Sequence, residues 1–192
     1  PSFRKSSGFI TLVYTFGMKQ LITLVIFLSL GLAQPSDMLE FPIYEPLQET
    51  VPLQVGSDNV VLLELTEGSS DLKVQVGSTT QTLPITYIIE GYTAHASLLV
   101  ADFNFDGFTD LALPNSEGYG GVNYFYRLYL YTSKGFEYLP LPEVEFACNP
   151  SLDKETSTLE TSCKSGPTWY QYHYRFTNGN AYLALATHLL TI

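Results

Sequence analysis

The residues best able to do chemistry lie in one short segment near the middle of the chain. Side-chain oxygens recur at positions 1, 3, 5 and 9 of Asp102-Phe103-Asn104-Phe105-Asp106-Gly107-Phe108-Thr109-Asp110. Ca²⁺ binds six to eight hard oxygen ligands in adaptable geometry, and Gly107 permits the sharp turn that brings a backbone carbonyl round to them. The segment therefore predicts a structural Ca²⁺ site, with ligands from Asp102, Asn104, Asp106, the Phe108 carbonyl and Asp110.

Two other interpretations of this acidic segment remain open. It could be a turn that holds itself together by Asx hydrogen bonds without any metal. Mg²⁺ fits less well because it keeps several waters. An EF-hand would need an acid at position 12, where Leu113 stands, and helices on both sides, where residues 96–101 and 111–113 are typical of strands. The pattern thus favours a strand–loop–strand site.

The elements that must position this loop are strands. Short segments rich in Val, Ile, Tyr and Thr alternate with Gly, Asn, Asp or Ser at the spacing of hairpins. The predicted strands are 59–66, 71–77, 85–90, 94–101, 109–113, 123–131, 135–139, 143–148, 157–163, 168–177 and 180–187. We expect an all-β antiparallel domain, either a small propeller-like or crossed-sheet arrangement or a β-sandwich, with little helix.

Two of these strands carry the clearest patterns. In 169–176 the even positions are all aromatic and the odd ones mostly polar, which predicts one buried aromatic face. Asn178-Gly179 follows and predicts a type I′ turn into 181–185. The segment 124–131 is apolar on both faces except at Arg127, so we expect a central strand that is covered on both sides.

Composition separates an N-terminal segment from the body of the chain. Residues 18–33 have a positive residue, an apolar stretch of about 12 residues and a small-residue end, the layout of a secretory signal peptide; a membrane anchor is the alternative. Residues 1–17 precede Met18 and are interpreted as a mis-annotated leader. Residues 34–52 form a Pro-rich lead-in, and 53–192 form the β domain. The signal peptide predicts that the protein is located in the periplasm or outside the cell.

The charge and the chemically reactive residues after residue 33 limit the kinds of partner and function that the exported part can have. After residue 33, six bases stand against 19 acids, which leaves a formal charge of −13 and argues against nucleic-acid binding. An oxidising compartment allows Cys148 and Cys163 to pair, which would join two strands of a hairpin near 143–163; free buried thiols are the alternative. His95, His173 and His188 are scattered, and no nucleophile turn or phosphate-binding loop is recognisable. We therefore expect a binding protein and not an enzyme.

The strand–Asp-x-Asn-x-Asp-Gly-x-x-Asp–strand pattern resembles the FG-GAP/VCBS calcium loops of extracellular β-propellers, in a single copy. More narrowly, the succession of DFNFDGFTDLAL, GYGGVNYFYRLYLY and NPSLDKETSTLETSCKSGPTWYQYHYRFTNG is similar to bacterial periplasmic i-type lysozyme inhibitors and immunity proteins against peptidoglycan hydrolases. That resemblance implies a lysozyme-like partner whose active site receives a Gly-rich loop.

The inhibitory motif of that group has its counterpart here at Ser116-Glu117-Gly118-Tyr119, with Glu117 at a position that the motif gives to glycine. The resemblance thus implies that Ser116, Gly118 and Tyr119 contact the partner. The alternative function is an FG-GAP-type, calcium-stabilised adhesion or surface-binding module, and a flexible hairpin without a partner is the simplest interpretation of the Gly-rich segment.

Overall fold

The computed structural model of the chain describes residues 38–42, 50–57, 59–65, 71–85 and 97–190. All of them belong to the second of two compact units, Asp37–Ile192; the first unit, Pro1–Ser36, lies outside them. The leader 1–17, the signal peptide 18–33 and His95 therefore also lie outside the described residues and stay predictions. Every regular element of the described part is a strand, and it contains no helix that could span a membrane.

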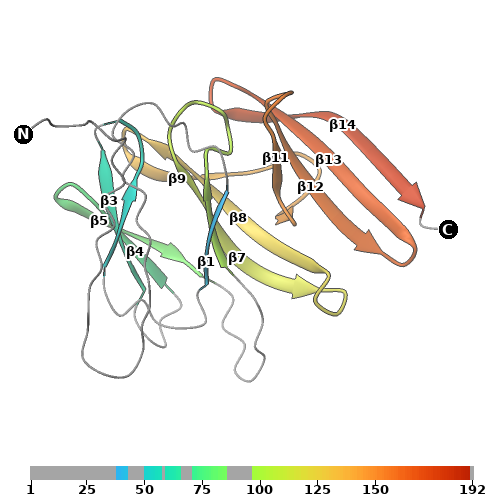
Figure 1. Cartoon of the computed structure of the whole chain (residues 1–192), viewed down its shortest axis with the longest axis horizontal. Coiled ribbons are helices and arrows are strands. Elements are labelled where there is room, and N and C mark those ends of the chain that lie inside the picture. The colour runs from blue at the N-terminus through green and yellow to red at the C-terminus, as the bar shows by residue number, and fades with distance from the viewer. Residues whose placement is uncertain (1–37, 43–49, 58, 66–70, 86–96, 191–192) are drawn as a thin grey trace, which may run out of the picture. The chain divides into compact units, whose positions relative to one another are not determined.

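The strands form three antiparallel sheets (Figure 1). The first sheet contains, in spatial order, β2 (Val51–Gln54), β3 (Val60–Leu65), β4 (Asp71–Val76) and β5 (Thr79–Pro84). The second contains β1 (Leu39–Pro42), β6 (Ser97–Ala101), β7 (Asp110–Gly118), β8 (Asn123–Thr132) and β10 (Ala147–Cys148), and β9 (Gly135–Leu139) also pairs with β8. The third contains β11 (Ser151–Asp153), β12 (Thr158–Ser165), β13 (Thr168–Thr177) and β14 (Asn180–Leu190). The prediction of an all-β antiparallel domain is confirmed.

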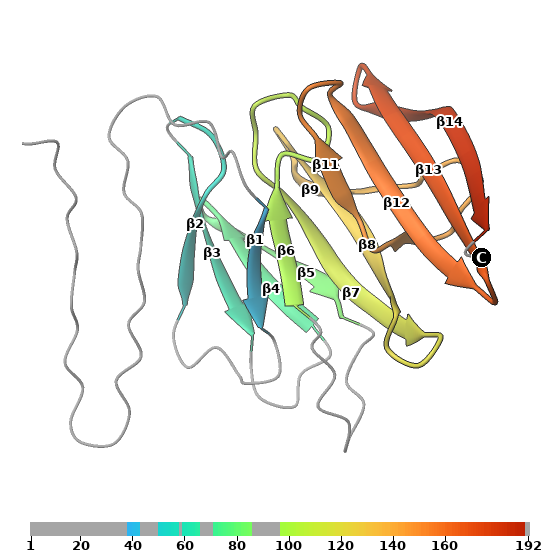
Figure 2. The ribbon, with the colours of Figure 1, turned by 45° about the vertical axis from the view of Figure 1, so that its right-hand side comes forward.

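The second sheet is buried on both faces because its strands are apolar at successive positions. One face packs with the first sheet in a core that includes Leu98, Val100, Leu111, Leu113, Leu63 and Val74. The other face packs with the third sheet in a core that includes Leu99, Ala101, Ala112, Leu128, Leu159 and Tyr174. Since side chains alternate between faces along a strand, β6 and β7 contribute to both cores. The sheets are therefore layered as in a sandwich, with β6, β7 and β8 in the middle layer (Figure 2).

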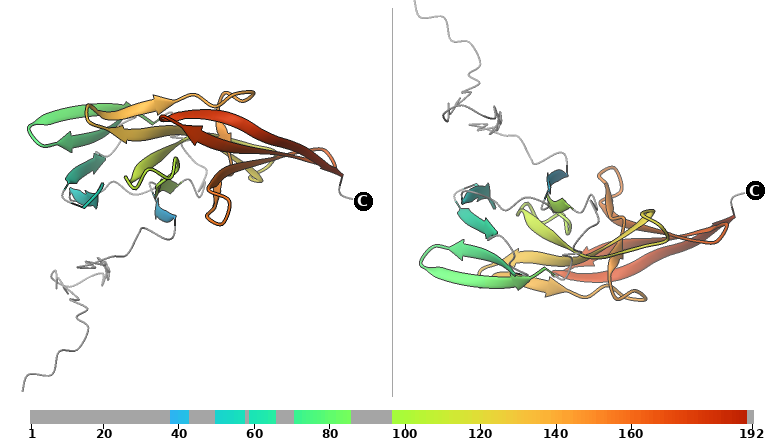
Figure 3. Two further views of the ribbon diagram at one scale, coloured as in Figure 1. Left: turned by 90° about the horizontal axis from the view of Figure 1, so that it is seen from above. Right: turned by 90° about the horizontal axis from the view of Figure 1, so that it is seen from below.

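The two strand patterns have different outcomes. The segment 124–131 is indeed covered on both sides, since Tyr126, Leu128 and Leu130 lie in one core and Tyr129 in the other. Asn178 and Gly179 both have positive φ, 50° and 74°, so the predicted hairpin turn is confirmed. The predicted aromatic face of β13 is wrong in extent: Tyr174 is fully buried, but the other aromatic side chains of this strand are only half-buried. The β13–β14 hairpin reaches past the other strands (Figure 3).

Several strand boundaries differ from the predictions. Strands β1, β2 and β11 were not predicted, and the first two begin inside the segment interpreted as a Pro-rich lead-in. Strand β5 (Thr79–Pro84) was not predicted either, because exposed threonines hide its alternation; the strand predicted at 85–90 lies, except for Ile85, outside the described residues and stays a prediction. The predicted strand 143–148 is reduced to β10, while β7 continues five residues past its predicted end, to Gly118.

The predicted pairing of Cys148 with Cys163 is confirmed as a disulfide with a Cα–Cα distance of 5.6 Å. The expectation that it joins two strands of one hairpin is wrong, because Cys148 lies on β10 of the second sheet and Cys163 on β12 of the third. The bond therefore links two layers. Closing a loop of this length contributes about 3 kcal/mol through the unfolded chain.

Candidate functional site

The acidic loop connects β6 to β7 in the middle layer. Ala101 and Asp110 face each other at the ends of these antiparallel strands, so the loop closes directly over their pairing. Positive φ values at Phe105 (60°) and Gly107 (88°) turn the chain, and Gly107 takes this conformation without a side-chain penalty. Phe103 is fully buried in the core beneath and anchors the loop.

The polar side chains of the loop converge on its own backbone. Both carboxylate oxygens of Asp102 accept hydrogen bonds, from the Asp106 amide at 3.0 Å and the Gly107 amide at 2.8 Å. Asn104 Oδ1 accepts from the same Asp106 amide at 3.2 Å, and Asn104 Nδ2 donates to Asp106 Oδ2 at 2.9 Å. Asp106 Oδ1 accepts from the Phe108 amide at 2.9 Å. Three of the predicted ligand side chains are thus held around one turn.

Asp110 lies apart from these three groups, at the base of the loop. Its side chain is fully buried, Oδ2 accepts from the Phe103 amide at 2.9 Å, and Oδ1 accepts from the Tyr131 amide at 2.9 Å. Burial raises the pKa of Asp110 to about 8, with nearby Asp106 and Asp102 adding to the rise. Burial also raises the pKa of Asp102, although hydrogen bonds from Gly107 and Asp106 oppose this. Negative charge on Asp102 and Asp110 is therefore energetically unfavourable.

Every predicted ligand atom is oxygen, and oxygen is the ligand atom that a hard cation such as Ca²⁺ prefers. In the described residues no group of three or more His, Cys, Asp or Glu side chains is arranged to hold a metal ion. The geometry corresponds to the Asx-turn alternative, in which carboxylates accept backbone amides. Ca²⁺ binding at this loop therefore stays a prediction, and the Phe108 carbonyl stays a predicted ligand.

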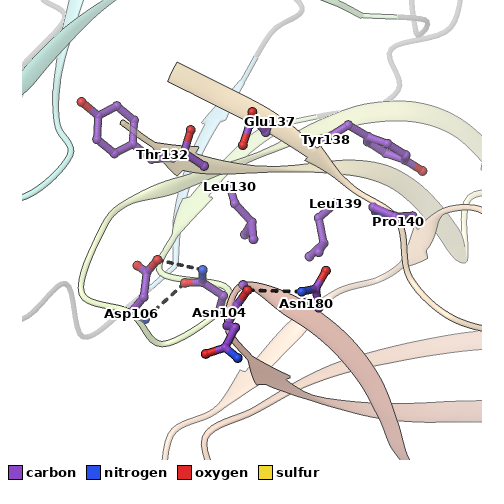
Figure 4. Close-up of a pocket in the computed structure, with 12 residues that line it drawn as sticks. Asn104, Asp106, Leu130, Thr132, Glu137, Tyr138, Leu139, Pro140 and Asn180 are labelled. Carbon is purple, nitrogen blue, oxygen red and sulfur yellow. Dashed lines mark hydrogen bonds between the residues drawn. The ribbon is translucent and has the colours of Figure 1, made fainter. Parts of the chain in front are cut away.

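A polar pocket of about 330 Å³ lies beside the loop (Figure 4). Leu130 and Leu139, both nearly buried, point into it, and Asn104, Asp106 and Asn180 border it from the loop and from the β13–β14 turn. The pocket gives solvent access to the side of the loop that carries Asp106.

The predicted partner-contact residues lie at the end of the β7–β8 hairpin. Ser116 and Gly118 belong to β7, where they pair with Phe125 and Asn123, so both lie within a strand of the hairpin. Only the turn 119–122 projects beyond the strands. Tyr119 has a φ of 52° and is 50% exposed, and its hydroxyl donates to the Gly166 carbonyl at 3.0 Å.

Two asparagines that the sequence analysis did not identify hold this hairpin against β12. Asn123 Nδ2 donates to the Lys164 carbonyl, and the Lys164 amide donates to Asn123 Oδ1, both at 2.9 Å. Asn149 Nδ2 donates to the carbonyls of Val122 and Ser162, at 2.9 Å each. No local pattern marks such residues, because their partners are 13 to 41 positions away. On the neighbouring strand β13, His173 Nδ1 lies 3.0 Å from Glu160 Oε1 of β12.

The fold and the site define an all-β module with a strand–loop–strand acidic turn and a disulfide between layers. Residues 96–131, which include β6, the acidic loop, β7 and β8, match the FG-GAP repeat family. No match was found among curated proteins or among solved structures. FG-GAP repeats and disulfides are typical of extracellular proteins, which is consistent with an exported chain.

Proposed function

We propose that this chain is an exported, calcium-stabilised binding protein without catalytic activity, and that it inhibits a lysozyme-like peptidoglycan hydrolase by inserting the turn 119–122 into the active-site cleft. One observation carries the proposal: the span that matches the FG-GAP repeat contains both an all-oxygen acidic loop and a rigid hairpin that ends in an exposed tyrosine. The calcium loop braces the base of β7, and the other end of β7 carries the tip.

Charge supports the calcium part of the proposal. Asp102, Asp106 and Asp110 lie in one nine-residue turn, and the ion pairs found in the described residues involve none of them. Besides burial, repulsion from Asp106 is one cause of the raised pKa values of Asp102 and Asp110. A bound Ca²⁺ offsets that repulsion and cross-links the two strands that the loop joins.

Calcium added to chelator-treated protein should give a measurable binding heat and raise the melting temperature. At an ion concentration of about 100 times Kd, the gain in unfolding free energy is about 2.7 kcal/mol. Asp106→Ala should lose most of both effects. Asp153→Ala is the matched control, because Asp153 also accepts backbone amides in a turn, from Glu155 and Thr156, but lies outside the acidic loop. Equal responses of the parent and the Asp106→Ala variant to calcium would contradict the metal site.

The form of the hairpin tip supports the inhibitory part. Gly120 and Gly121 have positive φ and no bulky side chain, so the backbone can approach a partner closely. Tyr119 offers a large amphipathic ring, the kind of anchor that is enriched at the centre of interfaces. A lysozyme-type cleft carries two carboxylates, and the Ser116 hydroxyl of the same hairpin is a donor of the kind that carboxylates bind.

Replacing Tyr119 with alanine should weaken inhibition of a lysozyme-type muramidase about 30-fold or more, since anchor residues of this kind contribute about 2 kcal/mol or more. Clearing of cell-wall suspensions by the enzyme, titrated with the protein, gives the inhibition constant. Tyr182→Ala is the control, because Tyr182 has a similar exposed fraction (46%) on β14. If the two variants inhibit equally well, the tip is not the inhibitory element.

The second candidate is an FG-GAP-type module that binds another surface ligand. The family match favours it, because residues 96–131 match an FG-GAP repeat. Calcium-dependent retention of the protein on cell envelopes, together with no effect on muramidase activity, would decide for this candidate.

A further inference from the structure

The tip of the β7–β8 hairpin is hydrogen-bonded to a second turn. The turn between β12 and β13 lies beside it, and the Tyr119 hydroxyl donates to the carbonyl of Gly166 in that turn. The reciprocal pair of hydrogen bonds between the Asn123 side chain and the Lys164 backbone joins the same hairpins one step further in. Asn123 is nearly buried, so these bonds are shielded from water. The two hairpin ends form one surface.

Covalent and polar links behind this surface hold it together. The Cys148–Cys163 disulfide ties β10 to β12 immediately next to Lys164. The neighbouring Asn149 bonds the carbonyls of Val122 and Ser162, one from each hairpin. A surface fixed in this way loses little conformational entropy when it binds a partner.

Lys164 lies on this surface beside two aromatic rings. Lys164 Nζ lies 5.8 Å from the centroid of the Tyr119 ring and 5.7 Å from that of Trp169, within the range of cation–π attraction. Lys164 and Trp169 are also directly opposite in the β12–β13 register, which puts their side chains on the same face. Lys164 is one of only six bases in the strongly acidic part of the chain after residue 33.

We propose that Lys164, flanked by Tyr119 and Trp169, is the contact that meets the paired carboxylates of the partner's cleft, so that the docking element consists of both hairpin ends and not of the 116–121 segment alone. This inference rests on the proposed inhibitory function. The cation offsets the negative charge that an otherwise acidic protein would bring toward two carboxylates, and the flanking rings fill the apolar walls of such a cleft. Lys164 is thus a specificity-determining residue of the interface.

Calorimetric titration of the full chain with a purified i-type lysozyme tests this assignment. Lys164→Met should weaken binding roughly 30-fold or more, and Lys164→Arg should restore most of the affinity, because one partner of a buried charge pair is lost in the first variant and kept in the second. Lys134→Met is the control for total charge; its side chain is 82% exposed in the turn at the opposite end of β8. It should bind like the parent.

The possible results distinguish a failure of the Lys164 contact from a failure of the proposed inhibitory function. If the parent binds the lysozyme and Lys164→Met binds equally well, the role of Lys164 is wrong while the inhibitory function stands. If Lys164→Met and Lys134→Met weaken binding by the same factor, bulk charge accounts for the effect and the specific contact is likewise refuted. If the parent does not bind the lysozyme at all, the inhibitory function fails and this inference fails with it.

Discussion

Replacing Tyr174 with alanine should lower the free energy of unfolding by about 3 to 5 kcal/mol, the usual cost of removing a buried aromatic side chain. Tyr174 is fully buried on β13, and it is one of the few residues through which the third sheet packs on the second. Its hydroxyl also donates to the Pro142 carbonyl at 2.9 Å. For a unit of this size the loss corresponds to a fall in Tm of roughly 10 °C.

Tyr174→Phe separates packing from hydrogen bonding. This variant keeps the ring and removes only the hydroxyl, so we expect a loss of about 1 kcal/mol. Thermal unfolding followed by circular dichroism, with denaturant titration for the free energies, measures both variants. A Tyr174→Ala variant that melts within a degree or two of the parent would mean that the third sheet does not rely on this contact.

Asp110→Ala should cost about 2 to 5 kcal/mol in unfolding free energy when measured in chelator, so that no metal contributes. The buried carboxylate is the acceptor for the amides of Phe103 and Tyr131, and alanine leaves both donors without a partner. The effect should be larger than that of Asp106→Ala, because Asp106 is exposed and water can replace its hydrogen bonds.

Asp110→Asn is the matched variant, since its amide oxygen can still accept one of the two hydrogen bonds. We expect it to unfold at a free energy between those of the parent and Asp110→Ala. Denaturant titration of the three proteins gives the order. If Asp110→Ala proves as stable as the parent in chelator, Asp110 does not hold the base of the acidic loop together.

The two halves of the proposed site lie at opposite ends of β7. Asp110 begins this strand and Gly118 ends it, so a rigid β7 connects the acidic loop with the hairpin tip. At positions 111–112 β7 is paired by both β6 and β8 and contributes to both cores, and from 113 to 118 it is paired by β8. Calcium at the loop would thus stabilise the strand that presents Tyr119.

The local sequence was sufficient to predict the class of fold and two turns, the hairpin turn at Asn178-Gly179 and the acidic turn that begins at Asp102. Alternation of apolar residues marks a strand by itself, and Asn178-Gly179 specifies a hairpin because only such residues take positive φ easily at both positions. The spacing of Asp102, Asn104 and Asp106 placed an acidic turn between two strands, where the structure has it. These features depend on residues a few positions apart, so the sequence alone determined them.

Tertiary structure alone decided which strands share a sheet and which side chains meet across sheets. Leu39–Pro42 pairs with β6, more than fifty residues later, and Tyr119 reaches Gly166, 47 residues away. Likewise, the disulfide links two layers where a hairpin was expected. Such partners are chosen by which arrangement buries the apolar faces and satisfies the backbone most completely, and that free energy belongs to the assembled sheets and not to any local run of residues.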